Sequence, residues 1–259
     1  MRSLIDILRG WSRHELWRTL GLQDIKSRYR RSVIGPFWIT ISMGVMVAAL
    51  GIVYGGIFDQ ELADYLPYLA AGFVMWAFIA SILTEGTNVF IGSQGLIKLL
   101  PAPLSIHVFK MLASNAMILV HNLMVFVVVA VIFELRPGIE LLMIIPAVLC
   151  VLFNGVWISI LLGLLSARFR DVPLVVSSVV QVMFFLTPVI WRPEMLINKR
   201  PMVLELNPFY HFMEILRAPL LGDFASTSHW IVIGCITAGG WITTLIVFEI
   251  YKKRLAYWI

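Results

Sequence analysis

The sequence predicts an all-α integral membrane protein with six transmembrane helices, and two observations carry this prediction. First, 60% of the 259 residues are apolar and only 14% are charged, and the mean hydropathy is +0.90. Soluble domains are typically about 45–50% apolar and about 25% charged. Second, apolar runs extend from residue 33 to residue 250 and leave no polar stretch long enough to fold separately. We therefore expect a single membrane domain over residues 33–259, preceded by a cytoplasmic segment over residues 1–32.

Six apolar runs are candidates for crossing a membrane, which takes about 20 helical residues. The runs are long and continuous and lack the short alternating pattern of barrel strands, so helices are favoured. The fifth run is the shortest and ends at Thr187-Pro188, where we expect a kink or an incomplete crossing. The six runs cover residues 33–57, 66–91, 106–133, 139–167, 174–191 and 230–251.

Basic residues are distributed unevenly among the connections, and this asymmetry predicts the orientation. Residues 1–32 hold eight Lys or Arg, the regions around the second-to-third and fourth-to-fifth connections hold two each, and the C-terminal tail holds three. The connections on the opposite side hold five. With an even number of spans, both termini are expected in the cytoplasm. The net charge of +5 is therefore attributed to orientation and lipid contact, not to nucleic acid.

Three segments between or before the spans are expected to be structured. Residues 3–22 place apolar side chains at spacings of three and four, which predicts an amphipathic helix lying in the inner interface. Residues 92–107 begin polar, carry a short apolar patch and contain Pro101 and Pro103, so a soluble protein could dock there. Residues 192–229 form an external loop too long to be structureless. Short re-entrant or surface helices are expected in it.

The sequence lacks the motifs of the common catalytic and metal sites. No GxxxxGK[ST] phosphate-binding loop occurs, so the chain is not expected to hydrolyse ATP. The five histidines have no metal-ligand spacing, and no GxSxG motif occurs. Cys150 and Cys235 lie inside apolar runs and are expected to be small buried hydrophobes. We therefore predict that the chain is not an enzyme and has no catalytic residues, no metal site and no cofactor of its own.

Polar residues inside the spans allow two interpretations, because each of them is costly in lipid. Glu85, Asn88, His121 and Asn154 could line a path for a hydrophilic substrate. Alternatively, they form hydrogen bonds between helices, with Glu85 paired to Lys110 or to an N-terminal arginine. For His121 and Asn154 the second interpretation is favoured.

Aromatic residues in and near the spans also allow two interpretations. Aromatic faces stack on sugar rings, so a conduit for a sugar polymer would use them as successive contacts. Alternatively, residues such as Trp38, Tyr65, Tyr68 and Trp191 are anchors at the membrane interface.

Several motifs occur in order and together cover nearly the whole chain. They are residues 24–38 (DIKSRYRRSVIGPFW), 85–88 (EGTN), 95–98 (GLIK) with Pro101 and Pro103, 168–171 (RFRD), 186–191 (LTPVIW), and 207–211 (NPFYH) followed by Arg217. In these motifs the chain resembles the permease subunits of ABC transporters that export polysaccharides.

The resemblance implies a half-transporter. Two copies would form a homodimer with a channel at their interface, lined mainly by helices 1 and 5. Two copies of a separate cytoplasmic ATPase would dock beneath and use ATP and Mg. The family places an amphipathic interface helix at the N-terminus and a coupling helix between spans 2 and 3. The implied cargo is an O-antigen chain on undecaprenyl diphosphate, moved across the bacterial inner membrane to the periplasm.

The resemblance also assigns candidate site residues. The channel lining is expected to include Phe37, Trp38, Tyr54, Gln181, Phe184, Phe185 and Thr187. The lipid diphosphate would meet Arg28, Arg30 and Arg31, unless these arginines only set the orientation. Coupling to the ATPase is assigned to Glu15, Arg18, Gly95, Lys98, Pro101 and Pro103. The cytoplasmic loop between helices 4 and 5 contributes Arg168, Arg170 and Asp171, and the external loop contributes Asn207, Pro208 and Arg217.

Three alternatives stay open at this point. The same architecture could export capsular polysaccharide or teichoic acid, and shared motifs do not decide among these cargoes. A drug or haem exporter permease is less favoured, because the sugar-polymer members carry the DIKxRYRRS pattern that this chain has. A membrane-bound glycosyltransferase or acyltransferase would need a cluster of catalytic side chains that the sequence does not show.

Overall fold

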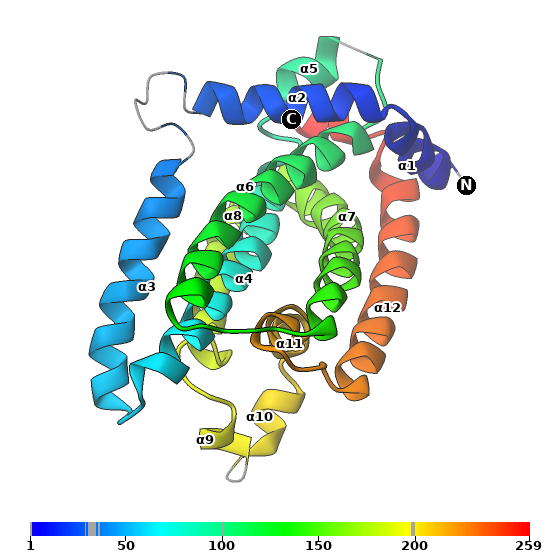
Figure 1. The fold of residues 1–259 in the computed structure, drawn as a ribbon. Helices are drawn as coiled ribbons and strands as arrows, with labels where there is room; N and C mark the ends of the chain where they lie inside the picture. The colour runs from blue at the N-terminus through cyan, green and yellow to red at the C-terminus, as the bar shows by residue number, and fades with distance from the viewer. Residues whose placement is uncertain (1, 29, 31–34, 36, 100, 198–199) are drawn as a thin grey trace.

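The computed structural model describes residues 2–28, 30, 35, 37–99, 101–197 and 200–259, and every regular element in these ranges is a helix (Figure 1). Two N-terminal helices, α1 (Arg2–Ser12) and α2 (His14–Arg28), lie at the end of a helix bundle that also carries the C-terminus. The long helices of the bundle are α3 (Phe37–Ile57), α4 (Leu62–Asn88), α6 (Ser105–Ile132), α7 (Ile144–Arg168) with the 3-10 turn η1 (Ile139–Met143) before it, and α12 (Thr227–Tyr251).

Five helical segments in the described part of the chain are long and apolar enough to cross a membrane. They are α3, α4, α6, η1 with α7, and α12. The remaining predicted span is α8 (Val172–Leu186), which has 15 residues. A helix of that length rises only about 22 Å, less than the roughly 30 Å of a hydrocarbon core. The predicted count of six is therefore not confirmed, and the expected early end at Thr187-Pro188 explains why α8 is short.

Shorter helices occupy the segments between the spans. Figure 1 shows α5 at the end with the termini, and α9 and α10 at the opposite end. α11 packs against α4, α7 and α12. Whether these helices take the coupling and re-entrant roles expected from the sequence stays a prediction. Their bounds are α5 (Gln94–Leu99), α9 (Glu194–Ile197), α10 (Pro201–Glu205), α11 (Pro208–Leu221) and α13 (Leu255–Trp258).

Helix α4 is the centre of the bundle. Of its most apolar stretch 72% is buried inside the chain, against 11% for α3 and 17% for α12. It contacts α3, α6, α7, α8 and α11. Small residues allow this close packing: a Cβ added at Gly86 would lie 2.8 Å from Ser159 Oγ of α7. An apolar helix with neighbours all round is expected at the core of a bundle.

The predicted N-terminal helix of residues 3–22 is broken at Arg13 into α1 and α2. Trp11 and Trp17 then both pack on Phe109 of α6, at ring-centroid distances of 5.4 and 6.1 Å. In one continuous helix these two tryptophans, six positions apart, would point about 120° away from each other. The break therefore lets both indole rings contact the same helix.

Polar side chains fasten α1 and α2 to the spans. The Asp6 carboxylate accepts hydrogen bonds from the backbone N–H groups of Leu104 and Ser105, at 3.3 and 3.1 Å. It thereby satisfies N–H groups that the first turn of α6 leaves without helical partners. The Ser3 N–H donates to Glu249 of α12 at 2.6 Å. Because these contacts link segments about 100 and 250 residues apart, the N-terminal helices are an integral part of the fold.

The intramembrane polar residues mostly bond between or within helices, as the second interpretation expected. The Asn154 Oδ1 accepts from Thr237 Oγ1 of α12 at 3.0 Å and from Trp157 Nε1 at 2.8 Å. Glu85 accepts from Asn115 Nδ2 at 2.8 Å. Of the two partners predicted for Glu85, Lys110 instead forms an ion pair with Asp24 at 2.7 Å, and pairing with an N-terminal arginine stays a prediction.

The two cysteines differ from each other in exposure. Cys150 is half-buried, as expected for a small hydrophobe in an apolar run, whereas Cys235 is exposed on α12. The prediction of burial is therefore wrong for Cys235. The reason is that an apolar run in a membrane protein also supplies the outer surface of the bundle.

The pair Gly239 and Gly240 tests the packing of α12 on α7. A Cβ at Gly240 would lie 2.4 Å from the Trp157 ring, whereas a Cβ at Gly239 meets nothing within 4 Å. Gly240→Ala should lower the free energy of unfolding by about 1–3 kcal/mol relative to Gly239→Ala, because overpacking has this cost. Both variants gain the same helix propensity, so thermal unfolding in detergent measures the difference. Equal melting temperatures would contradict the packing described here.

Candidate functional site

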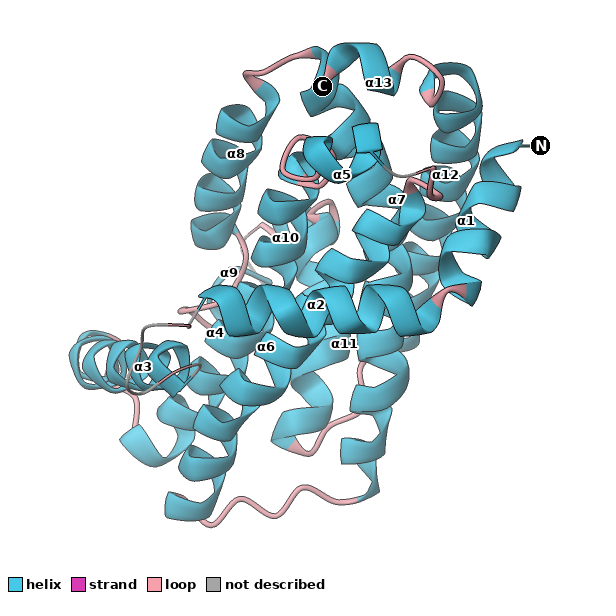
Figure 2. Ribbon diagram, turned by 90° about the horizontal axis from the view of Figure 1, so that it is seen from above, coloured by secondary structure: helices cyan, strands magenta, loops and turns pink. Residues whose placement is uncertain are grey.

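Helices α3 and α8 both pack against α4 and otherwise leave most of their surface open. The buried residues of α3 are Val47, Gly51 and Gly55, and α8 buries Val180 alone. Seen along the bundle, α3 and α8 lie on the side away from α1 and α12 (Figure 2). The exposed surface of these two helices is the candidate functional surface.

Polar residues distinguish the exposed face of α8 from an ordinary lipid-facing surface. Ser177, Ser178 and Gln181 are all exposed, with Phe185 one turn further along. The Ser178 hydroxyl donates back to the Leu174 carbonyl at 3.0 Å. Among the described residues, no hydrogen-bond partner is found for the Gln181 amide. An unpaired amide is costly in hydrocarbon, so this face is suited to water, a polar ligand or another protein surface.

The structure divides the predicted channel residues into two groups. Phe37, Trp38, Gln181 and Phe185 are exposed on α3 and α8, and Tyr54 is half-exposed near the far end of α3. Phe184 instead turns inward and stacks on Phe73 and Trp76 of α4. Thr187 is completely buried. In a single chain, therefore, the first group lies on the candidate surface and the second group supports it from behind.

The segment after α8, residues 187–192, is not helical, and side chains from elsewhere bind its carbonyl groups. Tyr65 donates to the Ile190 carbonyl at 2.7 Å. Tyr68 lies within hydrogen-bonding distance of the carbonyls of Pro188 (3.0 Å) and Trp191 (2.8 Å). These tyrosines come from the first turns of α4, and they are buried (1% and 7% exposed). The interpretation of Tyr65 and Tyr68 as interface anchors is therefore wrong, and their role is to fix this segment.

Arg217 of α11 completes the attachment of residues 187–192. Its side chain is buried, donates to the Pro188 carbonyl at 2.6 Å and forms an ion pair with Glu214. Its guanidinium also lies over the Tyr68 ring, 4.2 Å from the centroid, a geometry that attracts a cation. A buried charge is stable only when it is paired and hydrogen-bonded, and Arg217 has both kinds of partner.

The start of α11 is hydrogen-bonded to the same segment, residues 187–192. The Asn207 side chain caps α11 by accepting from the Phe209 N–H at 2.9 Å, and it donates to Thr187 Oγ1 at 3.0 Å. Pro208 occupies the first position of the helix, where a missing N–H has no cost. Of the predicted external residues, Asn207 and Arg217 both contact the segment that ends α8, and Pro208 begins the helix that carries Arg217.

The residues assigned to ATPase coupling lie at the opposite end of the molecule, where both termini are. Helix α5 exposes Gly95 and Lys98 together with Leu96 and Leu99, Leu99 being 80% exposed. Pro101 is exposed and Pro103 is half-buried after α5. Glu15 and Arg18 are exposed on α2.

The loop between α7 and α8 packs on the C-terminal helix. Arg168 lies over the rings of Phe169 and Trp258, and Arg170 donates to the Trp258 carbonyl at 3.1 Å. Asp171 directly precedes α8. The C-terminal helix α13 also contacts α5, so this end of the molecule presents one continuous surface.

Of the arginines assigned to a lipid diphosphate, the structure places one side chain. Arg30 is exposed just after α2. Arg28 ends α2, but its side chain and all of Arg31 lie outside the described residues. Their meeting with a diphosphate stays a prediction.

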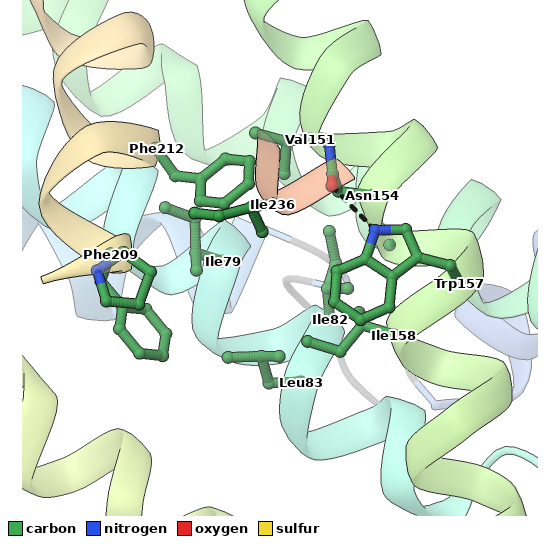
Figure 3. A pocket seen from close by; sticks show the side chains of 12 residues that line it. Ile79, Ile82, Leu83, Val151, Asn154, Trp157, Ile158, Phe209, Phe212 and Ile236 are labelled. Atoms are coloured by element: carbon green, nitrogen blue, oxygen red, sulfur yellow. Dashed lines mark hydrogen bonds between the residues drawn. The ribbon is translucent and has the colours of Figure 1, made fainter. Parts of the chain in front are cut away.

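An apolar pocket of about 320 Å³ lies among α4, α7, α11 and α12 and was not predicted (Figure 3). Its walls include Ile79, Phe209, Phe212 and Ile236. Asn154 also lines it, but its side-chain oxygen already accepts a hydrogen bond from Trp157 Nε1. Such a lining offers no polar groups to a sugar. Among the described residues, no three His, Cys, Asp or Glu side chains come together as metal ligands.

Comparison with known proteins identifies the family. The model of the ABC-2 type transporter family matches residues 15–221, most of the chain. The chain belongs to the ABC-2 type transporter family. Members are membrane subunits of transporters, and membership implies a partner ATPase. This agrees with the multi-pass helices and with the absence of a phosphate-binding loop from the sequence.

Curated relatives of this ABC-2 protein share one description. The O-antigen export system permease protein RfbA of Klebsiella pneumoniae is 23% identical over 233 residues, covering 89% of this chain and 88% of the relative. The protein of the same description from Myxococcus xanthus is 20% identical over 212 residues, covering 79% and 82%. The similarity thus extends over most of the length of this chain and of each relative.

Arg217 offers a direct test of the attachment of residues 187–192. Arg217→Met should lower the free energy of unfolding by about 3–5 kcal/mol, because it leaves Glu214 as a poorly compensated charge and removes one of the two donors to the Pro188 carbonyl. Melting of the purified protein, followed by size-exclusion chromatography after heating, measures this change. The control Arg200→Met removes an exposed arginine of the same loop and should stay within about 0.5 kcal/mol.

A second substitution separates the ion pair from the packing. Adding Glu214→Gln to Arg217→Met should recover part of the lost stability, since the remaining charge is removed. If Arg217→Met melts at the same temperature as Arg200→Met, the buried arginine does not hold this segment.

Proposed function

We propose that this ABC-2 permease is one half of an ATP-driven exporter, which moves undecaprenyl-diphosphate-linked O-antigen polysaccharide from the cytoplasm to the periplasm. The observation that carries the proposal is the exposed face of α8, where the Gln181 amide has no partner among the described residues and lies with serines and Phe185. Such polar groups are unfavourable on a helix that faces lipid. A path for a hydroxyl-rich polymer would use both the amide and the aromatic ring, since amides form hydrogen bonds with hydroxyl groups and aromatic rings stack on sugars.

The path would form between two copies of the chain. In a two-fold symmetric dimer the same surface of each subunit faces the other, so α3 and α8 of both copies would enclose the channel. The exposed aromatic residues Phe37, Trp38 and Phe185 would then become part of its wall. Lipid would surround the remaining sides, where α12 exposes apolar side chains such as Ile242 and Ile246.

The motor would be two copies of an ATPase that binds ATP and Mg, docked at the end where the termini lie. In the bacterial inner membrane this end would face the cytoplasm. Helix α5 offers the combination that suits a docking contact, because Leu96 and Leu99 are exposed beside Lys98. Glu15 on α2 lies at the same end (Figure 1).

The cargo assignment rests on the relatives and on charge. The similar proteins of Klebsiella pneumoniae and Myxococcus xanthus are described as O-antigen export permeases. Arg28, Arg30 and Arg31 precede α3 in the sequence, Arg30 is exposed just after α2, and arginine suits a phosphate ligand. Residues 187–192 and α11 would shape the exit on the other side.

A cross-linking experiment tests the dimer. In a chain with Cys150 and Cys235 replaced by alanine, Val182→Cys on α8 should form disulfide-linked dimers in oxidised membranes. The matched control Ile246→Cys on α12, with the same 57% exposure, should stay monomeric. Gel electrophoresis without reductant measures both. Dimers through α12 with none through α8 would exclude the proposed channel interface.

Deleting the gene tests the transport step and its cargo. Cells that lack the permease should keep full-length lipid-linked O-antigen in the cytoplasm, and surface O-antigen should fall to background and return with the wild-type gene. Immunoblotting of intact and lysed cells measures the two pools. Normal surface O-antigen would refute the cargo assignment. Loss of surface capsule or teichoic acid instead would identify that polymer as the cargo.

A further inference from the structure

A second and larger cleft lies far from the candidate channel surface. It has a volume of about 720 Å³, within the range of about 300–1,000 Å³ in which proteins enclose small ligands. Helices α1 and α2 form its roof, and α6, α7 and α12 form its walls. Its lining includes Leu8, Trp11, Leu22, Met117, Leu149, Leu152 and Phe153.

The shape of the cleft follows from small residues opposite large ones. Ala113 and Ala116 of α6 leave space below the roof, and Phe153 packs on Trp241 of α12 across from them at a ring-centroid distance of 4.9 Å. The break between α1 and α2 closes one end, because Trp11 and Trp17 stack there at 5.8 Å. The result is an apolar recess between α1 and α2 on one side and α6, α7 and α12 on the other. Figure 1 shows α1 and α2 at the end of the long helices.

The described lining of the cleft is apolar except for one basic side chain, that of Arg18. Arg18 both lines the cleft and is exposed, so this residue lies where the cleft opens to the surface. In the described part of the chain it takes part in no ion pair with a carboxylate. A long apolar recess with a single cation at its mouth complements a molecule with an apolar tail and an anionic head.

The surrounding charge favours the same kind of ligand. α1 and α2 carry three carboxylates, but Asp6 turns inward to cap α6 and Asp24 pairs with Lys110. Glu15 is therefore the one carboxylate of these helices that is not engaged with α6. Arg9, Arg13, Arg18 and Lys26 are exposed on or between these two helices, and Arg18 lines the cleft. Basic residues at a membrane surface attract acidic lipids.

We propose that the cleft binds an acidic phospholipid, with an acyl chain in the recess and the phosphate on Arg18. The roof helices lie at the level expected for headgroups, and the recess extends from there among spans. An arginine-phosphate contact is a strong charge-assisted hydrogen bond. The bound lipid would join α1 and α2 to α6, α7 and α12, and it gives Arg18 a ligand other than the ATPase.

The cleft is distinct from the path proposed for the cargo. It lies on the side of α1, α7 and α12, whereas α3 and α8 are on the other side of the bundle (Figure 2). A resident phospholipid is therefore favoured over the exported lipid. This inference does not depend on which polymer the protein exports.

Native mass spectrometry of the full-length protein tests the site. Protein would be taken from nanodiscs containing equal amounts of phosphatidylglycerol and phosphatidylcholine, and the lipid retained per chain would be counted. The wild type should retain one phosphatidylglycerol, with about tenfold preference over phosphatidylcholine. Arg18→Gln should reduce this preference to about parity, and Arg18→Lys should restore part of it. Ala116→Leu, which fills the recess, should lower retention of both lipids several-fold.

Two matched variants serve as controls. Arg200→Gln removes an exposed arginine outside the lining and outside α1 and α2, and Ala238→Leu enlarges an exposed alanine of α12; both should retain lipid as the wild type does. Equal retention of the two lipids by the wild type would overturn the proposal, as would unchanged retention in Ala116→Leu. Preferential binding of undecaprenyl diphosphate over phosphatidylglycerol would assign the cleft to the cargo instead.

Discussion

Backbone groups in a membrane must find hydrogen-bond partners within the protein, because lipid offers none. This constraint is most severe where α8 ends at Thr187, since Pro188 cannot continue the helix. The carbonyls of Pro188, Ile190 and Trp191 are satisfied by Tyr65, Tyr68 and Arg217. The Trp191 indole donates back to the Phe185 carbonyl at 3.0 Å. A break that would be prohibitive in lipid is thus made possible by side chains of α4 and α11.

The same constraint explains why α4 occupies the centre. It must carry the tyrosines that hold residues 187–192 and also let that segment approach closely. Gly72 meets the second need, since a Cβ there would lie 2.8 Å from the Val189 carbonyl oxygen. A central helix with hydroxyl donors at one end and small residues along its length can bind irregular backbone. The flanking helices α3 and α8 contact α4 and, in addition, α6 and α7 respectively, and their outer faces remain available.

Much of this fold is predictable from sequence because it follows from local patterns. Apolar runs located the long helices, and Pro188 located the end of α8. The amphipathic spacing of residues 3–22 located the N-terminal helices, although not their break at Arg13. With that break, Trp11 and Trp17 both contact Phe109, a residue about 100 positions away, and no local pattern reports such a contact.

The candidate site was predictable to a smaller extent for the same reason. From sequence, a tyrosine near the end of a span is predicted to be an interface anchor. Only the fold shows that Tyr68 faces the carbonyls of Pro188 and Trp191, about 120 residues further along. Asn207 and Arg217 were found through family resemblance, but their common contact with Thr187 and Pro188 was not. Exposure of Gln181 on α8 likewise depends on how the helix is rotated, which apolar composition does not fix.

The two ends of α8 are held by bonds of different strength, and this limits how the helix can move. At its C-terminal end, separation from α4 would break the hydrogen bonds of Tyr65, Tyr68 and Arg217 together, inside a region shielded from water. At its N-terminal end the loop is held by the exposed contact of Arg170 with the Trp258 carbonyl and by stacking of Arg168 on aromatic rings. Exposed contacts of this kind contribute little stability. The N-terminal end of α8 is therefore the end that separates from its neighbours at lower cost, and residues 187–192 form the firmly held end.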